Sequence, residues 1–142
     1  MKKIVTISLI AVLLMATMGA AGGQGTITVI MEGFNNDHGY ARVALFSSDD
    51  GFPEQFQKAF KKDKVKISGS RAKVVFNDVP YGEYAIALYH DEENTGRFER
   101  NFLGIPKQGY GVSGIETGFP SFEKSKFPVD TGNVTVEIRL YY

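Results

Sequence analysis

The sequence predicts an all-β fold, a single β-sandwich with one short helix and a long irregular loop. Short segments alternate apolar and polar side chains, as strands with one buried face do. Turn-forming residues separate these segments at short intervals, which is typical of sandwiches. The chain has 142 residues, a length that predicts one domain.

The first 21 residues have the pattern of a secretory signal peptide. Lys2 and Lys3 precede an apolar run at residues 4–18, and small residues follow at 19–21. The run is shorter than the roughly 20 residues of a spanning helix. We therefore expect a cleaved signal rather than an uncleaved anchor, a domain over residues 22–142, and no membrane span after cleavage. The expected location is the bacterial periplasm, the cell surface or the extracellular medium.

Charge and cysteine content narrow the possible partners. Residues 22–142 keep 14 of the 16 basic side chains against 16 acidic ones, a formal charge of −2. This balance argues against a nucleic-acid or anionic-membrane partner. The chain contains no cysteine, so we expect its stability to come from packing, or from packing plus a metal.

Six segments are expected to form strands. In the first, residues 26–32, Ile27, Val29 and Met31 share one face. Residues 83–91 are apolar on both faces, which predicts a central strand. The remaining expected strands are 41–47, 64–68, 72–76 and 133–142, and a turn is expected at 77–82.

Residues 53–62 are the good candidate for a helix. Pro53 suits a first helical turn, and the lysines at 61 and 62 suit the last. Phe52, Phe56 and Phe60 recur every four residues. We expect these three aromatic side chains to face the core.

Residues 91–130 break the strand rhythm and are rich in Gly, Pro and Phe. Long irregular segments in compact domains are usually functional or disordered, and aromatic content argues against disorder. We expect an ordered loop that lies on the sandwich. The candidate ligand or partner contacts are Tyr110, Phe119 and Phe122; together with Tyr81 and Tyr89 they would form a sugar-stacking platform, the alternative being ordinary packing.

Residues 91–99 carry the most informative polar pattern. With Asp91 as the first position, Gly96 falls sixth, as calcium loops require for their sharp bend. Phe102 stands at the twelfth position in place of a bidentate Glu, and a strand enters the loop, so it is not an EF-hand. Two hypotheses stay open, a solvated acidic loop and a Ca²⁺ site. The candidate metal ligands are Asp91, Glu93, Thr95 and Glu99.

No catalytic set is evident in the sequence, and we expect no enzyme. His90 and Asp91 are neighbours on a strand and point to opposite faces, so they do not form a catalytic pair. Ser113 lies in a stretch similar to a nucleophile elbow, but Ile115 occupies the position that needs Gly. The rival hypothesis is a hydrolase of an envelope or extracellular polymer, with His90, Asp91 or Glu99 meeting in a cleft.

Several motifs resemble one family of exported bacterial proteins, called domain of unknown function 2141. The resemblance covers essentially all of residues 22–142 and implies an exported β-sandwich with no established activity. Its members typically carry an Asp- and Asn-rich loop, from which Glu93 and Thr95 depart, and a Glu where this chain has Gln108. The motifs are residues 76–85 (FNDVPYGEYA), His90-Asp91, residues 104–106 (GIP), residues 109–111 (GYG) with Ser113, and residues 120–123 (PSFE).

The stretch at residues 76–84 is also similar to prealbumin-like and carboxypeptidase-regulatory sandwiches, which are mostly non-catalytic modules. The predicted architecture is therefore an immunoglobulin- or prealbumin-like sandwich. The leading functional hypothesis is an exported non-catalytic protein that binds a ligand or an envelope or extracellular partner through residues 91–128. A purely structural, self-associating envelope protein is a further alternative.

Overall fold

The computed structural model describes residues 22–115 and 118–142, so the expected signal peptide lies outside the described residues. Among the described residues, no helix combines the length and apolar character that a membrane crossing requires. In chain order, the described elements are β1 (Gln24–Glu32), β2 (Tyr40–Phe46), the 3-10 helix η1 (Phe56–Lys58), β3 (Lys61–Lys66), β4 (Arg71–Pro80), β5 (Gly82–Asp91), β6 (Tyr110–Val112), α2 (Phe122–Ser125), β7 (Phe127–Val129) and β8 (Asn133–Arg139).

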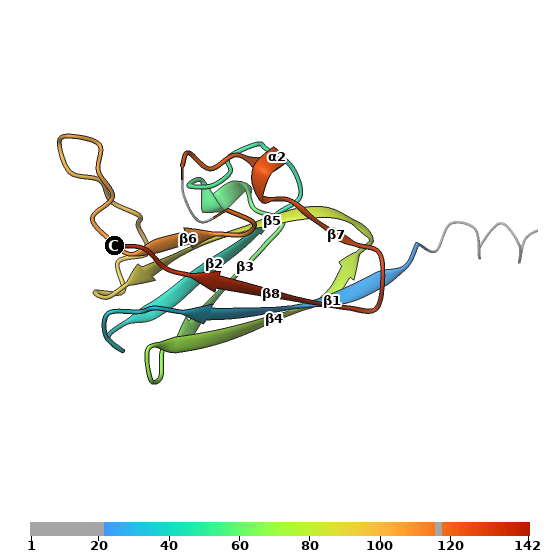
Figure 1. The fold of residues 1–142 in the computed structure, drawn as a ribbon, viewed down its shortest axis with the longest axis horizontal. Helices are drawn as coiled ribbons and strands as arrows, with labels where there is room; N and C mark the ends of the chain where they lie inside the picture. The colour runs from blue at the N-terminus through green and yellow to red at the C-terminus, as the bar shows by residue number, and fades with distance from the viewer. Residues whose placement is uncertain (1–21, 116–117) are drawn as a thin grey trace, which may run out of the picture.

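The strands form two sheets (Figure 1). In the three-stranded sheet, β1 lies between β4, to which it is antiparallel, and β8, to which it is parallel. The second sheet has the order β3-β2-β5-β6, and β7 pairs with the first residues of β5. This arrangement confirms the predicted all-β sandwich.

The main core lies between the two sheets. Ile27, Val29 and Met31 of β1 are fully buried, which confirms the inward face expected for this strand. They pack with inward residues of β2 and β5, such as Val43 and Ile86. Alternate residues of each strand supply this layer, because successive side chains of a strand point to opposite faces of the sheet.

A smaller core covers the outer face of the five-stranded sheet. Its buried centre is Ala44, Phe46 and Ala87, and the chain segments after β2 and β6 supply aromatic side chains that cover it. Strand β5 is therefore buried on both faces, as its sequence predicts. The covering side chains are Phe52, Phe56, Ala59, Val112 and Phe122.

The helix expected at residues 53–62 is wrong. The structure has turns and the three-residue helix η1, and Ala59 is already extended. The Phe60 N–H donates to the Leu45 carbonyl, and β3 begins at Lys61. The last residues of the expected helix therefore pair with β2 as an extended strand. The stretch that remains is far shorter than the roughly 12 residues below which an isolated helix is marginal. Phe60 is also more exposed than its spacing predicts.

The turn expected at residues 77–82 is also wrong in its extent. Strand β4 continues to Pro80, and only Tyr81 separates it from β5. The pairing register with β1 shifts by one residue near Asn77, and Asp78 has a φ of 56°. The polar pair Asn77-Asp78 therefore makes a β-bulge inside a strand, since Asn and Asp tolerate this backbone conformation.

The C-terminus closes one end of the sandwich over His90. This ring is fully buried, and its Nε2 lies 2.7 Å from the His38 carbonyl oxygen, which can only accept. Nε2 therefore carries the proton, and Nδ1 accepts from the Tyr142 hydroxyl at 2.6 Å. The same hydroxyl accepts from the Asn35 N–H at 3.1 Å. One phenol thus satisfies a buried imidazole and fixes the loop after β1.

The neighbouring residues Tyr141 and Tyr142 offer a matched test of this closure. Tyr142→Phe leaves the buried Nδ1 of His90 without its donor, so we expect a loss of about 1–3 kcal/mol in the free energy of unfolding. Among the described residues, Tyr141 bonds to Tyr110 through its backbone and its hydroxyl has no partner, so we expect Tyr141→Phe to change stability by less than about 0.5 kcal/mol. Urea unfolding of both variants checks this, and equal effects would contradict it.

Candidate functional site

A cavity of about 420 Å³ opens on the outer face of the five-stranded sheet. Its size falls within the roughly 300–1,000 Å³ of small-molecule sites. The floor comes from Ala87 of β5 and Val112 of β6, and the small side chain of Ala87 leaves space above the sheet. Its walls come from the segment before η1, from residues 98–106 and from residues 118–120. We call this cavity the outer pocket.

Aromatic rings line the outer pocket in a connected row. The Tyr89 ring lies 5.3 Å from that of Phe56 and 5.4 Å from that of Phe98, measured between centroids. The Phe98 ring lies 6.1 Å from that of Tyr110. Tilted and edge-on contacts at these distances are favourable, so the rings hold one another in place. The pocket therefore presents preformed apolar surfaces to a ligand.

The polar groups at the mouth of the pocket are mainly an ion pair between Arg100 and Glu54. The Arg100 guanidinium also lies 5.6 Å from the centre of the Phe98 ring and donates to the Gly104 carbonyl at 2.7 Å. In the floor, burial raises the pKa of Tyr89, an effect that Arg42 opposes. Tyr89 is thus a neutral phenol at neutral pH.

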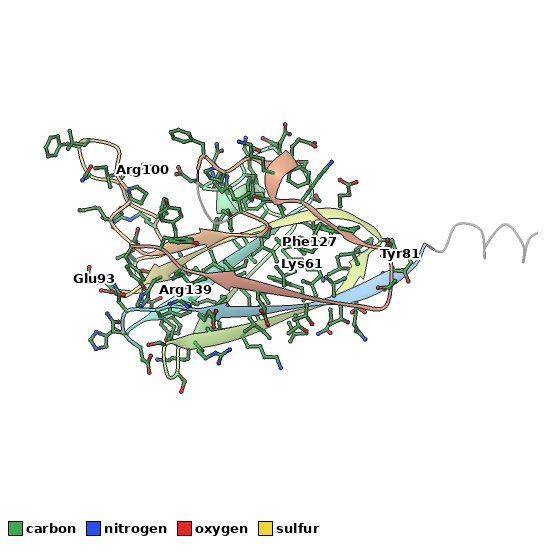
Figure 2. All side chains as sticks on the ribbon, viewed as in Figure 1. Lys61, Tyr81, Glu93, Arg100, Phe127 and Arg139 are labelled. Carbon is green, nitrogen blue, oxygen red and sulfur yellow. The ribbon has the colours of Figure 1, made fainter. Side chains whose placement is uncertain are left out.

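Residues 97–107, which we call the hairpin, form the wall that projects from the sandwich. Figure 2 shows Arg100 on this loop. The Lys107 N–H donates to the Glu99 carbonyl, and the backbones of Arg100 and Pro106 pair as an isolated antiparallel β-bridge. Gln108 closes the base, because its Oε1 accepts from the Glu99 N–H at 2.7 Å and its Nε2 donates to the Arg97 carbonyl at 2.8 Å. These hydrogen bonds hold the hairpin together, but it projects from the sandwich instead of lying on it as expected.

Asp91 anchors the turn that leads into the hairpin. Its Oδ2 accepts from Arg42 Nε at 2.5 Å and from the Gly96 N–H at 2.8 Å, while Oδ1 accepts from the Thr95 N–H at 2.9 Å. Burial raises the pKa of Asp91, but the Gly96 N–H, Arg42 and the Thr95 N–H together hold it below its usual value. Asp91 is therefore a buried anion, and Arg42 of β2 neutralises its charge.

The four candidate metal ligands line one small hollow of about 220 Å³, together with Lys107. Within residues 22–115 and 118–142, however, no three His, Cys, Asp or Glu side chains are grouped closely enough to hold a metal ion. Arg42 already neutralises Asp91, and Lys107 Nζ lies 3.8 Å from Glu99. Calcium binding at Asp91, Glu93, Thr95 and Glu99 stays a prediction, and these cations argue against it.

The predicted ligand contacts divide between two places. Tyr110 and Phe119 line the outer pocket, whereas Phe122 packs against Phe52 in the smaller core, with ring centres 6.2 Å apart. Tyr81 lies at the other end of the molecule from the hairpin (Figure 2). The five aromatic residues therefore do not form one sugar-stacking platform.

Sequence reasoning missed Phe98 and Arg100 as pocket residues. They stand two positions apart, and both side chains face the pocket. This alternation was the available signal. It was hidden because the glycines, prolines and charges around it made the whole segment look irregular.

His90 and Ser113 have structural roles. His90 is fully buried and both ring nitrogens are bonded, on the face of β5 opposite to Asp91. The Ser113 hydroxyl is buried, accepts from the Ile86 N–H at 2.9 Å and donates to the Ser125 carbonyl at 2.8 Å. Neither side chain is presented to a cleft, which argues against the hydrolase hypothesis.

Comparison with known proteins places the chain in a family. A protein-family model described as "Uncharacterized protein conserved in bacteria (DUF2141)" matches residues 29–137. The chain belongs to this family. The match runs from β1 to β8, so it includes the outer pocket and the hairpin. No curated protein and no solved structure matched the chain.

Both ends of the Gln108 amide are used at the base of the hairpin, because it accepts from the Glu99 N–H and donates to the Arg97 carbonyl. A carboxylate at this position would be able only to accept, so the bond to Arg97 depends on the amide.

The Arg42–Asp91 pair of this DUF2141 protein predicts a pH-dependent stability. Because the pKa of Asp91 is lowered by folding, its stabilising effect is present above the unfolded value of about 3.9 and is lost as pH falls through the folded value. We expect Asp91→Asn to cost about 1–3 kcal/mol at neutral pH. Urea unfolding from pH 7 to 2 should show the difference between wild type and variant shrinking below about pH 4. Asp37, whose pKa is also lowered, contributes equally to both proteins, and a constant difference would contradict the assignment.

The calcium hypothesis is tested at Glu93 and Glu99, because substitutions at these two residues leave the Arg42–Asp91 pair intact. We expect the thermal unfolding midpoint to be the same in millimolar calcium and in chelator. A calcium site in the folded protein would instead stabilise it by about 2.7 kcal/mol when calcium is in hundredfold excess over the dissociation constant, and this would raise the midpoint. A rise that Glu93→Gln and Glu99→Gln abolish would establish calcium binding.

Proposed function

We propose that this protein is an exported, non-catalytic β-sandwich that binds a small apolar, ring-bearing ligand in the outer pocket, within the bacterial envelope or outside the cell. The observation that carries the proposal is the outer pocket itself. It is ordered, walled by aromatic rings, and placed above a strand that is buried on both faces. Ligand sites built on such rigid elements are usually largely preformed.

The chemistry of the lining favours an apolar ligand over a sugar. Tyr89, Phe98 and Tyr110 offer ring surfaces, while Arg100 and Glu54 at the mouth already bind each other. A sugar carries many hydroxyl groups, and each buried one would need a hydrogen-bond partner. An aromatic or hydrocarbon ligand needs only the stacking and the release of water that these rings provide.

The rival functions have less support. A hydrolase built on His90, Asp91 or Glu99 would need these residues in one cleft, but His90 is buried and Asp91 is paired with Arg42. Self-association through β3 would join edge strands that each carry four lysines, Lys61, Lys62, Lys64 and Lys66. Lysines on an edge strand disfavour such pairing.

Two nearly fully exposed phenylalanines give a matched test of the outer pocket. Phe119 lines the pocket and Phe102 does not, although they are 91% and 95% exposed. We expect the anionic dye 1-anilinonaphthalene-8-sulfonate and the neutral dye Nile red to bind with enhanced fluorescence. Phe119→Ala should weaken both about three- to tenfold, the value of one aromatic contact, and Phe102→Ala should have no effect.

Fluorescence titration measures these affinities, and circular dichroism confirms that each variant keeps the fold. Equal weakening by both variants would show that the dyes bind exposed aromatic surface and not the pocket. Failure of both dyes to bind the wild-type protein would overturn the proposed ligand class.

A further inference from the structure

The end of the hairpin carries an exposed apolar pair that the outer pocket does not use. Phe102 is 95% exposed and Leu103 68% exposed, and neither lines the pocket. The backbone at Gly104 faces open space, because an added Cβ would meet no atom within 4 Å. Figure 1 shows this loop, in gold and orange, standing away from both sheets. We call Phe102 and Leu103 the hairpin tip.

The hairpin tip is held in a defined conformation. Asn101 is the organiser: its Oδ1 accepts from the N–H groups of Leu103 and Ile105, at 2.9 and 3.1 Å. Its own N–H and carbonyl bond to Ile105 and Gly104, both at 2.9 Å. Arg100 braces the turn from below through the Gly104 carbonyl. These hydrogen bonds thus hold two apolar side chains in a position exposed to solvent. Exposed apolar groups held in this way normally mark an interaction surface.

The size of the hairpin tip selects the kind of partner. A stable protein interface buries roughly 800 Å² and about 20–30 residues on each side. Two side chains at the end of a narrow loop supply a small fraction of that area. A bilayer interface has no such requirement, because each apolar side chain that enters it gains free energy on its own and no complementary shape is needed.

The charges of the hairpin suit the same partner. Arg97, Arg100 and Lys107 of this loop are basic, but Arg100 is paired with Glu54 and Lys107 with Glu99. Arg97 is therefore the basic side chain of the loop that no carboxylate pairs with among the described residues, while residues 22–142 carry a formal charge of −2. The overall balance predicts no long-range attraction to an anionic surface, but Arg97 beside an apolar tip favours lipid headgroups once the tip is in contact, within about a Debye length.

We propose that the hairpin tip anchors this protein to a lipid bilayer by inserting Phe102 and Leu103 into the headgroup region. The anchor is independent of ligand binding in the outer pocket, because neither Phe102 nor Leu103 lines it.

Vesicle sedimentation tests the anchor. Residues 22–142 are used, because both cores and every described strand lie within them. The vesicles are phosphatidylcholine alone, or an equal mixture of phosphatidylethanolamine and phosphatidylglycerol. We expect binding to both, stronger to the anionic mixture at low salt. Phe102→Ser with Leu103→Ser should reduce the bound fraction about tenfold or more, whereas Tyr81→Ser, a control at the other end of the molecule, should not.

A tryptophan probe gives a second, direct measurement. The chain contains no tryptophan, so Phe102→Trp places a single reporter at the tip and Tyr81→Trp places one at the opposite end. On adding vesicles, the tip tryptophan should shift to shorter emission wavelengths and be quenched by brominated lipids. The reporter at residue 81 should do neither.

Three outcomes would overturn the anchor. Vesicle binding that the double Ser variant leaves unchanged would place the contact elsewhere, and failure to bind either vesicle would exclude a bilayer. Light scattering that shows dimers without vesicles, lost in the double Ser variant, would make a second copy the occupant. Phe119→Ala separates this proposal from the pocket: it should weaken dye binding and leave vesicle binding intact.

Discussion

Strand β5 is hydrogen-bonded to β2, β6 and β7 and is buried on both faces. One face supplies Tyr84, Ile86, Leu88 and His90 to the main core, and the other supplies the floor of the outer pocket. Because a strand alternates its side chains, its register cannot slip by one residue without exchanging these two sets. The sandwich and the candidate site therefore depend on the same register. A change in β5 would be felt in both.

The end of β5 connects this register to the hairpin. His90 and Asp91 are consecutive and point to opposite sides, so each fixes a different part of the chain. His90 holds the loop after β1 and the C-terminus, while Asp91 joins Arg42 of β2 to the N–H groups of residues 95 and 96. The hairpin thus leaves the sheet from a turn held by a buried ion pair. This explains how a long segment without regular secondary structure forms a stable wall.

The sequence predicts most of the strands, because their buried faces follow a simple alternation that is visible at Ile27, Val29 and Met31. Prediction from the sequence fails where contacts with residues distant in the chain decide the local structure. The Phe52, Phe56 and Phe60 spacing resembles a helix, but β2 takes the residues from Lys61 into a strand. Asn77-Asp78 resembles a turn and is a bulge. The sequence also does not reveal that Arg42, 49 residues away, is the partner of Asp91, and calcium binding there stays a prediction. Two of the expected ligand contacts, Tyr110 and Phe119, line the outer pocket, whereas the sequence analysis did not single out Phe98 and Arg100 of the hairpin.

The parallel pairing of β1 with β8 has a consequence for the timing of folding. The first strand of the three-stranded sheet is completed by the last strand of the chain, and the final residue, Tyr142, closes the end of β5. Contacts between residues this far apart in sequence form slowly, because closing a long loop costs entropy before the contact is gained. We therefore expect the pairing of β1 with β8 to be among the last steps in the folding of the sandwich.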